Sequence, residues 1–356
     1  MVRKAAFRKL RHKFEKYGLD GILVSNLDNV RYLSGFTGSE GVILISRNGS
    51  YFLTGSRYTT QASEQTKGFI VREYDRREKE ISDLLSRLNI GTLGFEPQYV
   101  TFESYGKLSE RPQATKLIPI DEGLDDLRVV KEESEIRLIK EAIRIASESY
   151  LDVMESIKVG VEEREIALEI EHLMRRKGAE KVSFDTIVAS GKRAALPHGV
   201  ATTKTIKKGE FIVVDYGARY EGYYSDETQT VVVGKPTSKQ KQIYQIVKEA
   251  QEKAFEAIRP GIHVTKLDAA ARDHVDGAGF GKYFGHGTGH GVGLAIHELP
   301  HISPLGKGII EEGMVFTVEP GIYIPKWGGV RIEDMVRVTS DGYEKLTFLP
   351  KELRVV

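Results

Sequence analysis

The stretch FIVVDYG at residues 211–217 indicates how the second half of the chain folds. Its four leading apolar residues predict a buried strand, and Asp215 stands where that strand leaves the core. Asp226 follows 11 residues later and precedes the apolar run VVV at 231–233, which predicts the returning strand of a hairpin. Two carboxylates that face each other on paired strands repel unless a cation lies between them. The hairpin therefore indicates a cation site, with a solvated hairpin acid as the alternative.

A glycine-rich run supplies a third candidate ligand. Residues 285–293 read GHGTGHGVG, and so many glycines let the backbone approach a bound group closely. The run is not a phosphate-binding loop, because its spacing differs and no Gly-Lys-Ser or Gly-Lys-Thr follows it. We expect one of its two histidines, with His290 as the candidate, to bind a metal ion. The other, His286, would then shape the turn or donate a hydrogen bond.

Two acids in apolar, strand-like contexts complete the set. Glu319 follows MVFTV at 314–318, and Glu333 follows GGVRI at 328–332. An unpaired carboxylate is strongly disfavoured there, so each acid predicts a metal ion or an arginine as its partner. For Glu333 the alternative is a simple ion pair with Arg331, because residues two apart share one strand face.

Together these candidates are four carboxylates and one imidazole, a set that can hold two divalent metal ions. Bridging carboxylates neutralise the repulsion between two such ions and fix their spacing. The set is rich in oxygen and the chain has no cysteine, so manganese, cobalt or iron suits it at least as well as zinc. The candidate ligands are Asp215, Asp226, His290, Glu319 and Glu333.

The composition is that of a globular chain with balanced charge. Its 356 residues, 40% of them hydrophobic, are enough to form two domains with separate cores. A formal net charge of +1 gives no reason to expect nucleic acid or a membrane as partner. The N-terminal stretch lacks the apolar region of a signal peptide, and no stretch approaches a transmembrane span. With no cysteine for disulfides, we expect a cytoplasmic protein.

The order of helix and strand signals predicts two domains. Up to about residue 125, strands at 21–24, 42–45, 50–53 and 91–95 follow an amphipathic helix, which indicates an α/β domain. The second half predicts α+β architecture, with hairpin-like strands between helices at 134–157, 162–177, 239–258 and 264–277. Residues 121–135 are charged and helix-prone, and we place the domain boundary here, giving domains 1–127 and 128–356.

A series of motifs, in this order along the chain, resembles the Xaa-Pro peptidases, the family of the prolidases and aminopeptidases P. The motifs are FDTIVASG at 184–191, ALPHG at 195–199, VDYG at 214–217, SDET at 225–228, GHGVG at 289–293, EPGIY at 319–323 and VRIED at 330–334. The stretch NVRYLSGF at 29–36 is similar to the start of that family's N-terminal domain. The resemblance therefore covers nearly all of the chain.

This resemblance implies a fold, a cofactor and an assembly. The fold would be an α/β creatinase-like N-terminal domain plus an α+β pita-bread catalytic domain with a curved antiparallel sheet. The cofactor would be a binuclear centre, with manganese or cobalt favoured and zinc or iron as alternatives. The assembly would be a homodimer. The five family ligands map onto Asp215, Asp226, His290, Glu319 and Glu333, and all five positions are filled.

The activity that the resemblance implies is metal-dependent hydrolysis of the Xaa-Pro peptide bond, in dipeptides or at the N-terminus of longer peptides. Metal ions make a water that they hold a stronger nucleophile at neutral pH. By resemblance, Glu319 would take the proton of that water and return it to the leaving nitrogen. His198 would lie near the leaving nitrogen or the substrate backbone, and His297 would stabilise the tetrahedral oxyanion.

Three more positions bear on substrate binding. By resemblance, Arg331 would orient Glu333 or meet a substrate carboxylate, and Tyr323 would hydrogen-bond in the site. His301 stands where several dipeptidases of the family carry an arginine that holds the substrate carboxylate, so it favours longer peptides. The alternative to an enzyme is a catalytically silent, peptide- or protein-binding member of the same fold.

Overall fold

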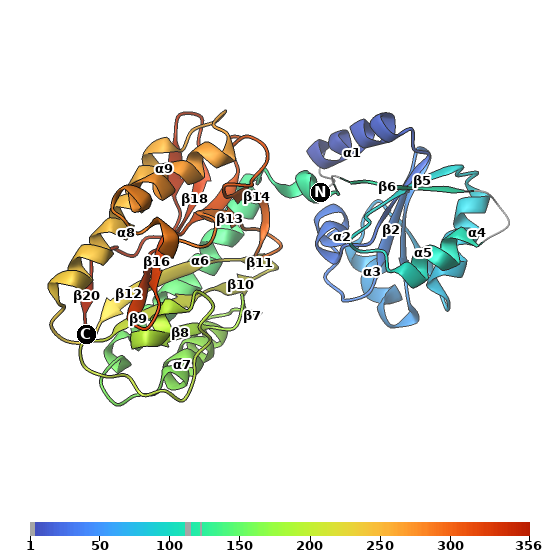
Figure 1. Ribbon diagram of the computed structural model, residues 1–356. Coiled ribbons are helices and arrows are strands. Elements are labelled where there is room, and N and C mark those ends of the chain that lie inside the picture. Colours follow the sequence, from blue (N-terminus) through green and yellow to red (C-terminus); the bar gives the residue numbers. More distant parts are fainter. Residues whose placement is uncertain (1–3, 111–114, 122) are drawn as a thin grey trace. The chain divides into compact units, whose positions relative to one another are not determined.

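The computed structural model describes residues 4–110, 115–121 and 123–356. The chain forms two compact units, which divide between Arg128 and Val129. We call the N-terminal one unit 1 and the C-terminal one unit 2 (Figure 1). No helix in this described part of the chain is long and apolar enough to cross a membrane.

Unit 1 is an α/β unit with one six-stranded sheet. Its strands are β1 (Gly21–Val24), β2 (Val42–Ser46), β3 (Gly49–Thr54), β4 (Ile70–Glu73), β5 (Thr92–Phe95) and β6 (Lys116–Pro119). Its helices are α1 (Lys4–Tyr17), α2 (Leu27–Ser34), η1 (Ser56–Tyr58), α3 (Thr59–Gln65), α4 (Arg77–Arg87), α5 (Phe102–Ser109) and η2 (Asp125–Arg128). The predicted strands of this half and its amphipathic first helix are confirmed.

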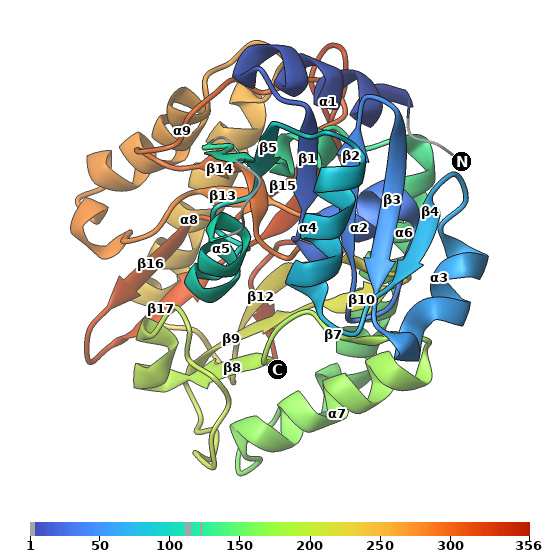
Figure 2. The same ribbon diagram turned by 90° about the vertical axis from the view of Figure 1, so that its right-hand side faces the viewer.

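The strands of unit 1 lie in the order β4-β3-β2-β1-β5-β6. β2 is antiparallel to both of its neighbours, and the other pairs are parallel. α4 and α5 cover one face of this sheet, where Ile81 and Leu108 belong to the same buried cluster as Leu44 and Leu53 (Figure 2).

The charged residues 121–135, which are helix-prone by composition, do not form one continuous helix. The helix begins only at Glu133, and η2 takes its place upstream, after Gly123 in the left-handed region at φ 64°. Arg128 donates a hydrogen bond from Nε to Asn29 Oδ1 (3.0 Å) and another from Nη2 to Asp125 Oδ1 (2.9 Å). These bonds tie the charged stretch back onto unit 1 instead of extending the helix.

Unit 2 contains four long helices and several small sheets, in which every strand pair except β12–β20 is antiparallel. The helices are α6 (Glu133–Val153), η3 (Met154–Ser156), α7 (Glu163–Arg176), η4 (Gly191–Ala195), α8 (Ser238–Ala257), α9 (Val264–Gly277) and η5 (Gly281–Tyr283). The strands are β7 (Lys181–Val182), β8 (Ile187–Ser190), β9 (Phe211–Tyr216), β10 (Ala218–Tyr220), β11 (Tyr223–Tyr224), β12 (Glu227–Val232), β13 (Gly289–Gly291), β14 (Glu298–Ile302), β15 (Val315–Val318), β16 (Gly321–Ile324), β17 (Gly328–Arg331), β18 (Asp334–Val338), β19 (Tyr343–Lys345) and β20 (Arg354–Val355). The four predicted helices are confirmed within a few residues at each end.

Two sheets of unit 2 position the candidate ligands. The first sheet has the strand order β20-β12-β9-β8, and the second sheet has the order β14-β13-β15-β18-β19. α6 and α7 pack on the first sheet, where Ile145 and Ile170 share a buried cluster with Val214. α8 and α9 pack on the second sheet, where Val247 and Leu267 share a cluster with residues such as Phe316 and Val336. Each sheet therefore has its own pair of covering helices (Figure 1).

Alternation along β9 directs its carboxylate away from the α6–α7 pair. Ile212, Val214 and Tyr216 belong to the cluster under that pair. Phe211 belongs to the other cluster, with α8. Because successive side chains of a strand point to opposite faces, Asp215 shares the face of Phe211. The strand therefore presents its acid to the interior between the two sheets.

Candidate metal centre

A cavity of about 420 Å³ in unit 2 brings most of the predicted site residues together. Its lining includes all five candidate ligands and also His198, His297 and Arg331. Two of the predicted site residues, Tyr323 and His301, are not among the residues that line this cavity. Tyr323 contacts the lining from behind, and His301 is exposed beside His290 in the β13–β14 pair.

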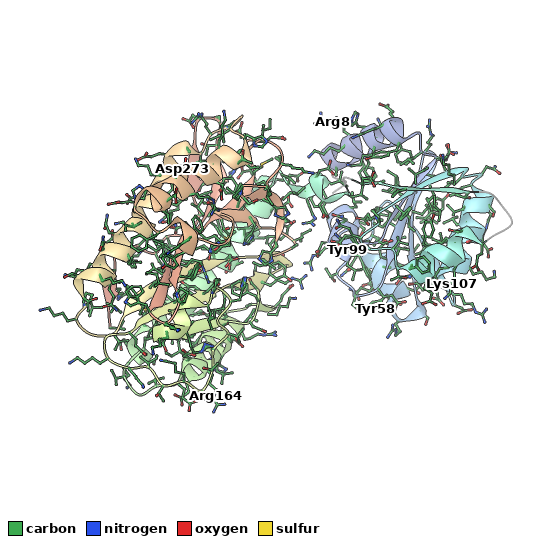
Figure 3. All side chains as sticks on the ribbon, viewed as in Figure 1. Arg8, Tyr58, Tyr99, Lys107, Arg164 and Asp273 are labelled. Carbon is green, nitrogen blue, oxygen red and sulfur yellow. The ribbon has the colours of Figure 1, made fainter. Side chains whose placement is uncertain are left out.

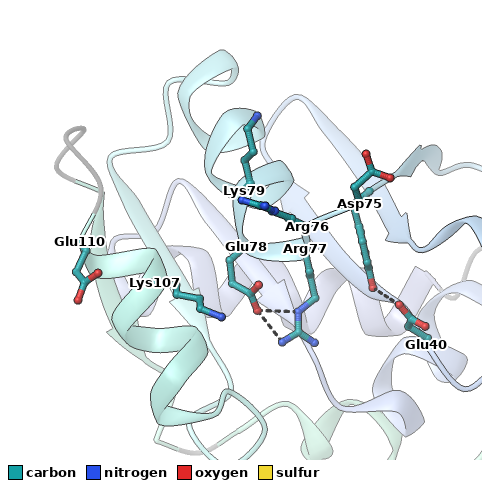
Figure 4. Close-up of a pocket in the computed structure, with 9 residues that line it drawn as sticks. Glu40, Asp75, Arg76, Arg77, Glu78, Lys79, Lys107 and Glu110 are labelled. Atoms are coloured by element: carbon teal, nitrogen blue, oxygen red, sulfur yellow. Dashed lines mark hydrogen bonds and ion pairs between the residues drawn. The ribbon is translucent and has the colours of Figure 1, made fainter.

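A larger cavity, of about 1010 Å³, lies in unit 1 and has a different character. Figure 4 shows its lining, in which Arg77 donates to Glu78. Tyr74 donates to Glu40 Oε1 at 3.0 Å. Two of its four acids, Glu40 and Glu78, are thus paired with donors of the protein itself. Among the described residues, the metal-ligating side chains whose ligand atoms converge lie in unit 2 and are Asp226, His290 and Glu333.

The hairpin of β9 and β12 places its two acids diagonally and not face to face. Asp215 is the register partner of Thr228, and Asp226 comes two residues before Thr228. Residues two apart share a face, so Asp226 lies on the face of Asp215 but one step along the sheet. The predicted returning strand is confirmed, and the expectation of directly facing acids is wrong by this one step.

His290 presents an unprotonated nitrogen to two carboxylates. Its Nδ1 lies 3.1 Å from the carbonyl oxygen of Gly291, which can only accept, so Nδ1 carries the proton. Burial lowers the pKa of His290, which favours the neutral ring. Its Nε2 then carries a lone pair, 3.6 Å from Asp226 Oδ2 and 3.3 Å from Glu319 Oε1. Three acceptors that converge in this way need a cation or a proton between them.

Glu319 and Glu333 are each held by one threonine hydroxyl. Thr317 Oγ1 donates to Glu319 Oε1 (3.1 Å), and Thr228 Oγ1 donates to Glu333 Oε2 (2.6 Å). Burial raises the pKa of Glu319. Burial and then repulsion from Glu319 and Asp215 raise the pKa of Glu333 well above its usual value. The same causes, burial first and Glu333 next, raise the pKa of Asp226.

These residues fit divalent cations. Ligand atoms of Asp226, His290 and Glu333 all lie within 4.8 Å of one another. Asp215 Oδ1 is buried and has no hydrogen-bond partner among the described residues. Buried carboxylates that raise one another's pKa are stabilised as anions when positive charge is placed among them. The donor set of oxygen atoms and one imidazole nitrogen is one that several divalent metals accept.

Arg331 is the cation that the protein itself supplies, and its acidic partner is Asp215 instead of Glu333, the partner in the alternative ion pair. Nη2 donates to Asp215 Oδ2 at 2.6 Å, and Nε donates to Thr228 Oγ1 at 3.0 Å. Nη1 donates both to the carbonyl of Pro197 (3.0 Å) and to the hydroxyl of Tyr323 (2.9 Å). With four of its five N–H groups bound to the protein, Arg331 is a scaffold for Asp215.

Tyr323 and His286 extend this network, and His286 itself lines the cavity. His286 Nδ1 lies 2.8 Å from the Gly287 carbonyl and is therefore protonated, so its Nε2 accepts from the Tyr323 hydroxyl at 2.9 Å. Burial raises the pKa of Tyr323 to about 12. The predicted hydrogen-bonding role of Tyr323 is seen here as a link between His286 and Arg331. His286 donates a hydrogen bond to the turn, as expected for the second histidine.

His297 lies against the imidazole of His290, with ring centroids 4.3 Å apart. Partial desolvation, and then repulsion by the neighbouring imidazoles, lowers the pKa of His297 to about 4. At neutral pH its ring is thus uncharged and can donate one N–H into the cavity. His198 lines the same cavity from the loop after η4 and is exposed.

A residue that the sequence did not single out holds the His198 loop. Glu163 is fully buried, whereas the next side chain, Arg164, points away from α7 into solvent (Figure 3). Glu163 Oε1 accepts from the N–H and the hydroxyl of Ser190 (both 2.8 Å). Its Oε2 accepts from the N–H (3.2 Å) and the hydroxyl (2.8 Å) of Thr202. Glu163 thus holds the two ends of the loop, Ser190 and Thr202, together. The sequence indicated only that Glu163 lies near the start of a helix.

We expect Glu163→Gln to loosen this loop. An amide keeps one acceptor oxygen and turns an NH₂ group toward donors, so buried N–H or O–H groups lose their partner, at a cost of about 1–3 kcal/mol. Tryptic cleavage at Lys192 and Arg193, followed by mass spectrometry, should accelerate. The matched control is Glu162→Gln, which changes the neighbouring cap of α7 and should leave cleavage at these two sites unchanged. Equal cleavage in both variants would contradict the assignment.

Comparisons with known proteins place the chain among metallopeptidases. Residues 137–340 match metallopeptidase family M24, and residues 7–130 match the creatinase/prolidase N-terminal domain. The chain belongs to metallopeptidase family M24, as its motifs indicate. It is 40% identical to an Xaa-Pro dipeptidase of Pyrococcus horikoshii, over 97% of each chain. It is also 44% identical to an uncharacterized peptidase of Bacillus subtilis, over 98% of this chain and 99% of that protein.

Solved structures give the same result for the fold. An Xaa-Pro dipeptidase from Bacillus anthracis matches with a TM-score of 0.96 at 44% identity, over 99% of each chain. An X-Pro aminopeptidase from Thermotoga maritima matches with a TM-score of 0.89 at 41% identity, over 97% of this chain and 100% of the other. The predicted fold class, a creatinase-like N-terminal domain with a pita-bread catalytic domain, is confirmed.

Proposed function

We propose that the protein is a metal-dependent peptidase that hydrolyses Xaa-Pro bonds, in dipeptides or at the N-terminus of longer peptides. The observation that carries the proposal is the convergence of four carboxylates and the bare Nε2 of His290 in one cavity. Two relatives that match over nearly their whole length are named an Xaa-Pro dipeptidase and an X-Pro aminopeptidase. Both names support the Xaa-Pro bond as the bond that is hydrolysed. The silent binding module is disfavoured, because a protein that only binds peptides has no need of five intact ligands.

In this proposal unit 2 is the catalytic domain and unit 1 the creatinase-like domain, in line with the predicted domains 1–127 and 128–356. Divalent ions, once bound, would polarise the scissile carbonyl and lower the pKa of a water. Manganese or cobalt is favoured, with zinc or iron as alternatives. The homodimer and the cytoplasmic location stay predictions from the sequence. The proposed ligands are Asp215, Asp226, His290, Glu319 and Glu333.

The chain's own residues would orient a ligand, transfer a proton and bind the substrate. Arg331 fixes the carboxylate of Asp215 by one oxygen, which leaves Oδ1 for a cation. Glu319 lines the cavity and would accept the proton of the attacking water and deliver it to the proline nitrogen, which cannot leave as an unprotonated amide anion. His297 would donate its N–H to the developing oxyanion, and His198 would hydrogen-bond the substrate backbone from the loop that Glu163 closes.

Hydrolysis of a small peptide set tests the proposal. With Mn²⁺ supplied, the protein should cleave Ala-Pro and Ala-Pro-Ala and leave Ala-Ala-Ala essentially intact. Ala-Pro-Ala and Ala-Ala-Ala differ at the bond to be cleaved, which in the proline peptide is a tertiary amide without an N–H. An Xaa-Pro enzyme must accept this amide. Cleavage of Ala-Ala-Ala at a similar kcat/KM would replace the proposal by a general aminopeptidase.

His301 gives a test of substrate length. We expect His301→Arg to raise kcat/KM for Ala-Pro relative to Ala-Pro-Ala by about tenfold, the effect of one charge-assisted hydrogen bond to the dipeptide carboxylate. His301→Gln is the control, because it changes the side chain without adding a charge, and its ratio should stay near that of the wild type. An unchanged ratio in His301→Arg would remove His301 from the substrate-binding residues.

A further inference from the structure

The proposed ligands come from two sheets that meet along a seam. The hairpin of the first sheet carries Asp215 and Asp226, whereas His290, Glu319 and Glu333 lie on or beside strands of the second sheet. At the seam, Glu333 N donates to the carbonyl of Thr228 (3.2 Å), and Thr228 Oγ1 donates to Glu333 Oε2. The spacing between ligands of the two sheets therefore depends on what holds the seam closed.

A buried ionic cluster lies behind the seam. Glu227 and Asp334 follow the ligands Asp226 and Glu333 in the chain, so their side chains point to the opposite side of the strands. Glu227 Oε2 accepts from Ser147 on α6 at 2.6 Å, which places Glu227 on the helix side of the first sheet. Lys351 Nζ lies 2.7 Å from Glu227 Oε1 and 3.4 Å from Asp334 Oδ1. The lysine thus contacts one acid from each sheet.

The path of the C-terminal segment explains this placement. β19 pairs with β18 in the second sheet, and β20 pairs with β12 in the first, so the segment between them crosses from one sheet to the other. Lys351 stands in that crossing and is 6% exposed, beside Glu227 at 2% and Asp334 at 0%. An ammonium group buried at this depth is held by its two carboxylates and keeps both close to it.

We propose that Lys351 is a positioning residue of the metal centre, which ties the two sheets together behind the seam and so sets the spacing of the ligands in front of it. The inference rests on the proposed function, because the ligands are those of the proposed centre. The competing explanation is an ion pair that contributes only to stability. Such a pair exists elsewhere in unit 2, where Lys131 Nζ lies 2.6 Å from Glu298 Oε1 with side chains 1% and 2% exposed.

The sign of the effect on metal affinity separates the two explanations. Loss of a positive charge near an acidic cluster strengthens the attraction of that cluster for a cation. By charge alone, Lys351→Met would therefore bind metal more tightly. If Lys351 sets the spacing of the ligands, the same variant binds metal more weakly, because ligands that are held out of position lose affinity.

The experiment titrates the full-length, chelator-stripped protein with Mn²⁺ by calorimetry, and circular dichroism verifies the fold of each variant. We expect at least a tenfold rise in the Mn²⁺ Kd for Lys351→Met. Lys351→Gln, which keeps a hydrogen-bond donor but not the charge or the reach, should show the same direction and carries the test if the methionine variant fails to fold. Lys351→Arg should restore the Kd to within about threefold of the wild type.

Lys131→Met is the matched control, since it removes another buried lysine, 4% exposed, from a Lys–Glu pair. Glu298 lies within the second sheet, where it is the register partner of Gly291 beside His290, so this pair does not join the two sheets. The substitution should lower the melting temperature and change the Mn²⁺ Kd by less than about threefold. The proposal is overturned if Lys351→Met and Lys351→Gln bind Mn²⁺ as tightly as the wild type, or more tightly, while they lose stability as Lys131→Met does. A wild type that binds no Mn²⁺, Co²⁺ or Zn²⁺ would overturn the proposed metal centre itself, and the inference with it.

Discussion

Glu319→Gln should reduce kcat for Ala-Pro-Ala by about 10²- to 10⁴-fold while the fold stays intact, because an amide cannot accept and return the proton that the leaving nitrogen needs. The substitution keeps the size of the side chain and leaves one oxygen for the hydroxyl of Thr317. Steady-state kinetics with saturating Mn²⁺ measures the effect. Glu312→Gln, at an exposed acid of the same unit, should change kcat little and serves as the control.

Loss of metal is a second route to an inactive Glu319 variant, because Glu319 is also a proposed ligand. The metal content of the variant, measured in the same preparation, separates the two. A variant that retains its metal but not its turnover supports proton transfer by Glu319. Near-normal turnover in the metal-loaded variant would remove Glu319 from this role.

Arg331→Met should have the largest effect on stability, a loss of about 3–5 kcal/mol in the free energy of unfolding of unit 2. Arg331 is 4% exposed, and its removal leaves the Asp215 carboxylate buried without its cation. It also withdraws the donors that hold Tyr323, Thr228 and the carbonyl of Pro197. Denaturant unfolding measures this change. The protein is kept metal-free so that bound metal does not contribute to the measured stability.

The control for this prediction is Arg337→Met, which breaks an ion pair with the largely exposed Glu133. Surface pairs contribute little, so its unfolding curve should nearly coincide with that of the wild type. A similar small change in Arg331→Met would mean that the guanidinium is not what compensates Asp215. Addition of Mn²⁺ should recover part of the lost stability, since a bound cation also compensates this carboxylate.

The strand pattern predicted much of unit 2, because burial on both faces gives uninterrupted apolar runs such as residues 211–214. The long helices were equally clear from their apolar periodicity. The described residues of 121–132 form no regular α-helix because a long-range contact decides their conformation. Their charged composition favours a helix, but Arg128 is bound to Asn29, about 100 positions earlier, and contacts at such separations leave no local signal.

The candidate site shows the same limit at the level of single contacts. Period-two alternation placed Arg331 and Glu333 on one strand face and left an ion pair between them as the alternative to metal binding by Glu333. The register of β12 against β9 instead places Asp215 within reach of the guanidinium. The roles of Glu163 and Lys351 could not be predicted from the sequence for a related reason. A buried acid or lysine is recognised only through the partners that the fold brings to it. Residue type and local context revealed the ligands, whereas the residues that hold them depend on tertiary structure.

The most direct test of the metal centre removes the metal and returns it, with metal content and hydrolysis measured on the same samples. The protein is stripped with chelator, refilled with manganese, cobalt or zinc in turn, analysed by inductively coupled plasma mass spectrometry and assayed with Ala-Pro-Ala. We predict that stripping abolishes cleavage and that two equivalents of manganese or cobalt per chain restore it. Full activity in stripped protein, or metal binding that never restores cleavage, would contradict the account.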